Sequence, residues 1–173
     1  VDGTAFTVGP NSSVTLDRFI YNPETADGSL EVTSRGLLRL VGGKVTKKTP
    51  AIIRTNAATV GIRGGIAIVQ TQGQSTKAAF VYGDQMTVTP TQNADGETTL
   101  TEDGFVVTVK NPSDNIEYPD LLTAESLSVL QEDLQAEEKE EESDEDSSDE
   151  DSSDDDSSSD DDSSSDEDSS DND

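Results

Sequence analysis

The chain has 173 residues, neither cysteine nor histidine, and a formal net charge of −27 at pH 7. Without those two residue types it cannot form a disulfide, a thiolate metal site, a cysteine nucleophile or a Ser-His-Asp triad. The charge is uneven, because residues 1–130 hold ten basic and fourteen acidic residues, whereas residues 131–173 hold one lysine and twenty-four acidic residues.

Residues 4–110 have the pattern of short β-strands separated by turns. Apolar and polar residues alternate at 5–8 and 13–21, and β-type segments recur up to residue 109, with 36–41 fitting either a strand or a short amphipathic turn. Glycine, proline and asparagine between the segments favour turns, because they tolerate or preset particular φ angles. About ten strands at nearly regular spacing predict an all-β fold, and we expect a twisted β-roll or solenoid-like domain.

The apolar positions of these segments give the expected core. In a strand, alternate side chains share one face, so the apolar residues of all the segments can point inward together. We expect the core to contain Val14, Leu16, Phe19, Leu38, Leu40, Ile53, Val60, Ile62, Ile66, Ile68, Phe80, Val88, Phe105 and Val107.

One run, residues 55–65, is more specific than composition alone would produce. Arg63 is a single charge among small and β-branched residues, with glycines at 61, 64 and 65. A phosphate-binding loop would need a Lys-Ser/Thr pair and a following helix, and the run has neither. We therefore predict a tight turn in which Arg63 is a structural anchor that donates hydrogen bonds to neighbouring groups.

Two further sets of charged residues have simpler interpretations. A basic group has no interleaved aromatic residues, so we expect a solvated turn and no nucleic-acid binding; it consists of Lys44, Lys47, Lys48 and Arg54. Acidic residues at predicted turns are interpreted as surface groups, and an enzyme that uses two carboxylates, such as a glycosidase, has the least support. These acidic residues are Asp17, Asp27, Glu102 and Asp103.

Residues 120–138 predict one amphipathic helix. Its leucines recur at helical spacing, at positions 121, 122, 127, 130 and 134. Thr123, followed by Glu125, is typical of a helix N-terminus. We expect the leucines to pack on the β-domain.

Residues 139–173 form an acidic, serine-rich segment. This composition cannot bury enough apolar surface to offset the entropy of the chain, so the segment is predicted to be disordered. We interpret it as a soluble, extended spacer, with weak Ca²⁺ binding by its carboxylates as the alternative, and we expect no other cofactor. The candidate calcium ligands are Asp154, Asp155, Asp156, Asp160, Asp161 and Asp162.

Four ordered motifs resemble those of the FecR-domain family. They are the predicted hairpin over residues 2–17, the segment Phe19-Ile-Tyr-Asn-Pro, the segment 36–44, and the segment 49–64. The residues that carry the signature are Gly9, Pro10, Asn11, Gly61, Arg63 and Gly64.

The resemblance implies a non-enzymatic, extracytoplasmic all-β domain of the kind used in periplasmic sensing, with a protein partner, in the periplasm or at the cell surface of a Gram-negative bacterium. We expect residues 1–112 to form this domain and 113–119 to be a linker. No apolar run approaches the roughly 20 residues of a membrane span. The start at Val1, in what reads as the middle of a hairpin, leads us to expect a fragment of a larger exported protein. A second hypothesis is a structural or adhesive surface module whose acidic segment is a calcium-responsive spacer.

Overall fold

The structure is a computed structural model that describes residues 2–116 and 119–144. Ten strands form one mixed sheet, which confirms the predicted all-β fold of about ten strands. The strands are β1 (Ala5–Val8), β2 (Ser13–Tyr21), β3 (Gly28–Arg35), β4 (Leu37–Val41), β5 (Ala51–Arg54), β6 (Ala58–Gln72), β7 (Ser75–Pro90), β8 (Thr98–Leu100), β9 (Phe105–Val109) and β10 (Asp120–Leu121). The helical elements are α1 (Lys44–Lys48), the short 3-10 helix η1 (Ala94–Gly96) and α2 (Ala124–Asp144).

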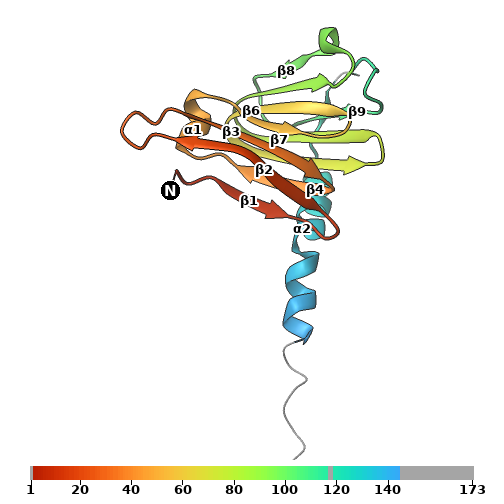
Figure 1. Ribbon diagram of the computed structural model, residues 1–173. Helices are drawn as coiled ribbons and strands as arrows, with labels where there is room; N and C mark the ends of the chain where they lie inside the picture. Colours follow the sequence, from red (N-terminus) through yellow and green to blue (C-terminus); the bar gives the residue numbers. More distant parts are fainter. Residues whose placement is uncertain (1, 117–118, 145–173) are drawn as a thin grey trace, which may run out of the picture.

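The long hairpin of β6 and β7 runs through the whole sheet (Figure 1). β5 pairs with the first half of β6 and β4 with the second half. On the other side of the hairpin, β9 pairs with the first half of β7 and β8 with the second half. The hairpin therefore joins two half-sheets: a first half-sheet in the order β2-β3-β5-β6-β7-β8, and a second in the order β1-β4-β6-β7-β9-β10.

Glycines let both long strands bend between the two half-sheets. Gly64 and Gly65 in β6 have φ angles of 49° and 135°, and Gly83 in β7 has a φ of 149°. A Cβ atom on Gly65 would lie 2.0 Å from the carbonyl oxygen of Tyr82, so this position accepts only glycine. The predicted tight turn around Arg63 is therefore wrong. The glycines bend a continuous strand, and the turn lies earlier, at residues 55–58.

Side chains from both half-sheets meet in one core. Most of the predicted core residues are buried there, and the largest buried side chain is Phe80. Val14 and Phe105 pack against this core while remaining half-buried, and Ile66 is also half-buried. The prediction is wrong for Leu16 and Phe19, which are exposed on β2, an edge strand.

Helix α2 covers the outer face of the second half-sheet. Its Leu130 and Leu134 pack on a small apolar cluster from the sheet, formed by Leu37, Ile68, Ala79 and Val106. Leu122 and Leu127 also pack against this cluster, so the predicted packing of the leucines is confirmed for four of the five. It is wrong for Leu121, which lies in β10 and is exposed. The helix begins at Ala124, later than predicted, because Asp120 and Leu121 pair with β9. Thr123 caps it, since its Oγ1 accepts a hydrogen bond of 3.2 Å from the backbone N–H of Ser126.

None of the helices that the structure describes is both long and apolar enough to cross a membrane. Residues 145–173 lie outside the described residues. The predicted disorder of this segment and its six candidate calcium ligands, from Asp154 to Asp162, are therefore outside them as well.

Candidate interaction surfaces

The motif at residues 9–11 forms the turn between β1 and β2. The predicted hairpin over residues 2–17 is wrong, because β1 pairs with β4 and β2 pairs with β3. Gly9 donates its backbone N–H to the carbonyl oxygen of Leu37 at 2.8 Å, and Leu37 donates its own to Ser12 Oγ, also at 2.8 Å. A Cβ atom on Gly9 would lie 3.0 Å from Leu37 Cβ, and Asn11 has a φ of 52°. The turn after β1 is thus fastened to the start of β4. These signature residues have a structural role.

Asp2 holds the start of α1 and was not singled out from the sequence except as part of a motif. Its carboxylate accepts hydrogen bonds from Thr4 Oγ1 at 2.7 Å, the Thr4 backbone N–H at 3.0 Å and the Val45 N–H at 3.4 Å. Burial raises the pKa of Asp2, but these hydrogen bonds together outweigh it and hold the pKa below the ordinary 3.8. Asp2 therefore ties the N-terminal segment to α1.

Arg63 is not a buried anchor. It lies in β6 with its side chain exposed, and its Nε donates one long hydrogen bond of 3.4 Å to the carbonyl oxygen of Lys47. This bond reaches the C-terminal turn of α1, where a positive charge is favourable. The residue that closes the turn is Thr55, whose Oγ1 accepts from the Ala58 N–H at 2.9 Å and bonds Thr76 Oγ1 at 2.8 Å.

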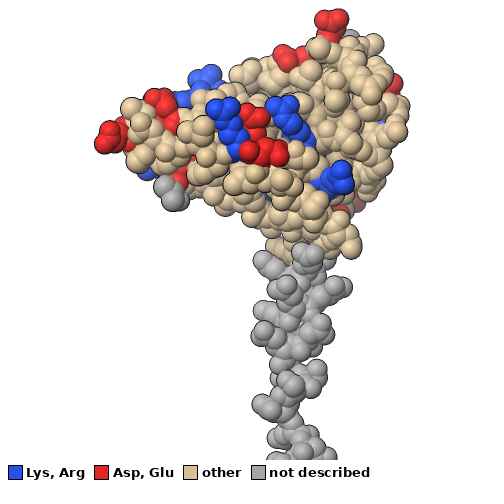
Figure 2. Space-filling view, in the orientation of Figure 1, with Lys and Arg blue, Asp and Glu red and all other residues tan. Residues whose placement is uncertain are grey.

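The outer face of the first half-sheet is polar and carries paired charges. Glu31 on β3 lies 3.0 Å from Arg54 of β5 and 4.0 Å from Arg18 of β2. Figure 2 shows acidic and basic side chains side by side on this face. The predicted basic group is divided among these contacts, since Lys48 pairs with Asp27 at 3.1 Å, near the hairpin end of β2 and β3. Arg54 pairs with Glu31 instead.

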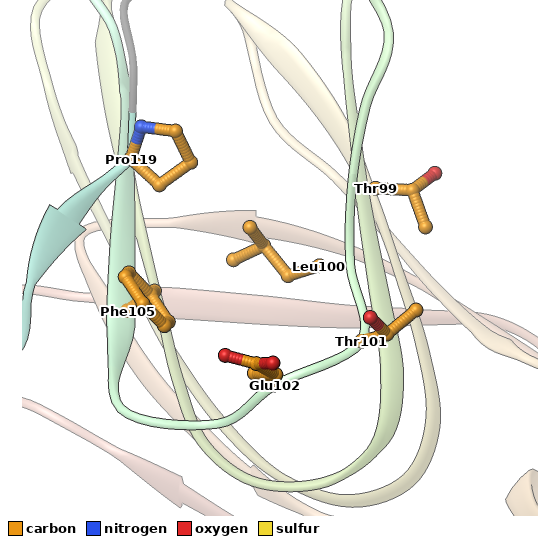
Figure 3. Close-up of a pocket in the computed structure, with 6 residues that line it drawn as sticks. All are labelled: Thr99, Leu100, Thr101, Glu102, Phe105 and Pro119. Carbon is orange, nitrogen blue, oxygen red and sulfur yellow. The ribbon is translucent and has the colours of Figure 1, made fainter.

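A small cleft opens where β8 and β9 diverge (Figure 3). Its volume is about 290 Å³, and Leu100, Phe105 and Pro119 give it an apolar floor. Of the described residues, Glu102 alone contributes a carboxylate to the lining. Among the residues that the structure describes, neither Asp103 nor another acid joins Glu102 in the lining. Among the described residues, no group of three or more acidic side chains is arranged to hold a metal ion.

A second, larger groove lies between α2 and the outer face of the second half-sheet. Its volume is about 620 Å³. Leu121 and Val129 border it as exposed apolar side chains, with 71% and 52% of their surface accessible. Three acidic residues and one basic residue also line it: Asp120, Glu125, Asp133 and Lys77. We call this the α2 groove. The sequence pattern predicted a packing helix here, but it missed the groove because Val129 lies outside the leucine series.

Comparison with known proteins shows similarity of fold. No family model matches the chain, and none of the curated proteins is a significant match. Two crystal structures of a "putative anti-sigma factor" from Parabacteroides distasonis are similar, with TM-scores of 0.58 and 0.54 at 15% and 18% sequence identity. Each alignment covers 75% of this chain but only 57% or 56% of the other, so the chain spans little more than half of their length.

Proposed function

We propose that this chain is a non-enzymatic, FecR-like binding module of an extracytoplasmic regulatory protein, and that it recognises a protein partner in the α2 groove. The observation that carries the proposal is the combination of exposed Leu121 and Val129 with a charged rim in the α2 groove. The fold shared with proteins named as anti-sigma factors and the motif resemblance over residues 2–65 both support a regulatory role.

The lining of the α2 groove indicates the chemistry of the partner segment. Apolar side chains of a partner would bury Leu121 and Val129, which is the usual source of affinity at an interface. Asp120, Glu125 and Asp133 outnumber Lys77, so complementarity of charge favours a partner segment with basic residues at its edges.

Site-specific photo-cross-linking tests this surface in the native full-length protein. A photoreactive amino acid at Val129 should form one discrete adduct with a partner protein, and the additional substitution Leu121→Asp should abolish it. The same reagent at Asp95, an exposed residue of η1 that does not line the groove, is the matched control and should give no such adduct. Identical adducts from both positions, or none from Val129, would contradict the proposal.

Placement outside the cytoplasm is tested separately. A fusion of the native full-length protein to alkaline phosphatase, which is active only after export, should be active, and a fusion to a cytoplasmic reporter should not. The reverse result would remove the extracytoplasmic part of the proposal and leave the α2 groove untouched.

The second candidate is a structural or adhesive surface module with a calcium-responsive spacer. The observation that favours it is the regular alternation of aspartate and serine after residue 143. Calcium binding by that segment would separate it from the first candidate.

A further inference from the structure

Strand β2 is an edge strand with an unusual amount of exposed apolar surface. It pairs with β3 alone, so the backbone N–H and C=O groups along its other side have no strand partner among the described residues. Leu16, Phe19 and Ile20 are 56%, 42% and 50% exposed. Proteins normally shorten, cover or charge such an edge, because it readily pairs with another chain.

The sequence of β2 is complementary to itself. When two copies of β2 are placed antiparallel with the two-fold axis between Asp17 and Arg18, each Asp17 lies opposite Arg18 of the second copy. In the same register, each Leu16 lies opposite Phe19 of the second copy. If the central residues carried charges of one sign only, the two copies would repel each other. With Asp17 next to Arg18, two attractive charge pairs form between the copies.

A β-bulge makes this register consistent with the two faces of the sheet. The pairing of β2 with β3 shifts between Leu16 and Arg18, so Asp17 is an extra residue. Leu16 pairs with Val32 and Phe19 with Leu30, and both of these partners are buried. Leu16 and Phe19 therefore share the inner face although they are three positions apart, which a regular strand would not allow.

The charged groups are held on the opposite face. Thr33 Oγ1 donates a 2.7 Å hydrogen bond to Asp17 Oδ2, and Arg18 lies 4.0 Å from Glu31. Both side chains remain at the surface and available to a second copy. The contact of Leu16 with Phe19 and the contact of Asp17 with Arg18 can thus form between the two copies in the same register.

We propose that two copies of this chain associate by antiparallel pairing of their β2 strands about an axis between Asp17 and Arg18. The first half-sheet then continues from one copy into the other, and Leu16 and Phe19 of both copies are covered. This inference depends on β2 and does not involve the α2 groove, so either proposal can fail while the other stands.

Charge reversal tests the register. Sedimentation equilibrium of the chain at about 150 mM salt, where charges more than roughly 8 Å apart are screened, should show a monomer–dimer equilibrium. Asp17→Arg and Arg18→Asp should each weaken the dimer by at least about tenfold, because each places like charges opposite one another. An equimolar mixture of the two variants should restore dimers, since each variant supplies the charge that the other lacks.

Matched variants keep the result interpretable. Asp103→Arg makes the same charge change at an exposed turn far from β2 in the sequence and should leave dimerisation unchanged. Circular dichroism and melting show whether each variant is folded. If either charge variant does not fold, the double substitution Leu16→Thr and Phe19→Thr removes the apolar pair instead and should also give monomers. A monomer at every concentration up to about 1 mM, a dimer insensitive to these changes, or no recovery in the mixture would overturn the proposal.

Discussion

Gly65 and Gly83 lie opposite each other in the β6–β7 hairpin, at the point where both strands bend. Their backbones approach so closely that a Cβ atom on Gly65 would lie 2.4 Å from Gly83 Cα. The side chain that draws attention in the sequence, Arg63, is exposed nearby and makes one long hydrogen bond. At the scale of single residues, the fold depends more on these glycines, which have no side chain, than on Arg63.

Gly65→Ala should destabilise the domain by about 3 kcal/mol, because it combines a φ that alanine rarely adopts with a backbone clash. Gly61→Ala is the control in the same strand. Its new Cβ would lie 3.7 Å from Ile52 Cδ1, an ordinary contact, so the change should stay within about 1 kcal/mol. Urea unfolding of both variants measures the difference, and equal losses would show that the bend does not require glycine.

Asp2→Asn should remove a pH-dependent part of the stability. The pKa of Asp2 is lowered in the folded state, so its charged form stabilises the fold above the unfolded pKa near 3.8, and this contribution is lost as pH falls through that value toward the folded pKa. Urea unfolding from pH 7 to pH 3 should show a steeper loss for the wild type than for the variant, which should be less stable by about 1 kcal/mol at pH 7.

Asp103→Asn makes the same change at an exposed turn and is the comparison for Asp2→Asn; it should cost less stability at pH 7 than Asp2→Asn does. Parallel profiles for the wild type and Asp2→Asn would mean that the hydrogen bonds at the start of α1 do not distinguish the charged carboxylate from the neutral one.

At the scale of elements, the alternation of apolar and polar residues predicted nearly all the strands and most of the core. A strand with one buried face shows this alternation directly in its sequence. It could not show that β6 and β7 are continuous, since clustered glycines signal a turn and a bend equally well. Nor could it show that Leu16 and Phe19 are exposed. Whether a strand is central or at an edge depends on pairings between distant segments, which the strand's own residues do not specify.

Leu134→Ala tests how α2 is held on the sheet. Leu134 is buried against the cluster that includes Ile68 and Ala79, so the substitution should destabilise the domain by roughly 2–3 kcal/mol. Val129→Ala, on the same helix but half exposed, should change stability by less than about 0.5 kcal/mol. Thermal or urea unfolding compares the two, and equal small effects would mean that the helix contributes little to the fold.

At the scale of the whole molecule, the charge is distributed unevenly along the sequence. The part up to residue 130 is nearly balanced, whereas residues 131–173 carry twenty-four acidic residues and one lysine. Some of these acidic residues lie on α2, whose final turns lead away from the sheet (Figure 1). An excess of acidic residues of this size in one part of the sequence repels other acidic surfaces and attracts cations.

A peptide of residues 143–173 should give only weak, non-saturating heat when titrated with Ca²⁺ at about millimolar concentration. Calcium sites of useful affinity need six to eight oxygen ligands held in a defined geometry, and a self-repelling chain has to order itself to supply them. Isothermal titration calorimetry makes the measurement. A saturable isotherm would favour the calcium-responsive spacer over a plain one.

The single long hairpin also has a consequence for the order of folding. β6 and β7 are adjacent in sequence and pair from Ala58 with Pro90 to Gln72 with Ser75, so they can zip together from a two-residue turn without closing a large loop. All the remaining strands attach to this hairpin, either directly or through one or two neighbouring strands. The parallel pairing of β3 with β5 requires the intervening β4 and α1 to cross over first. We therefore expect folding to nucleate at the β6–β7 hairpin, in the middle of the sheet, and β2 to be among the last strands to pair.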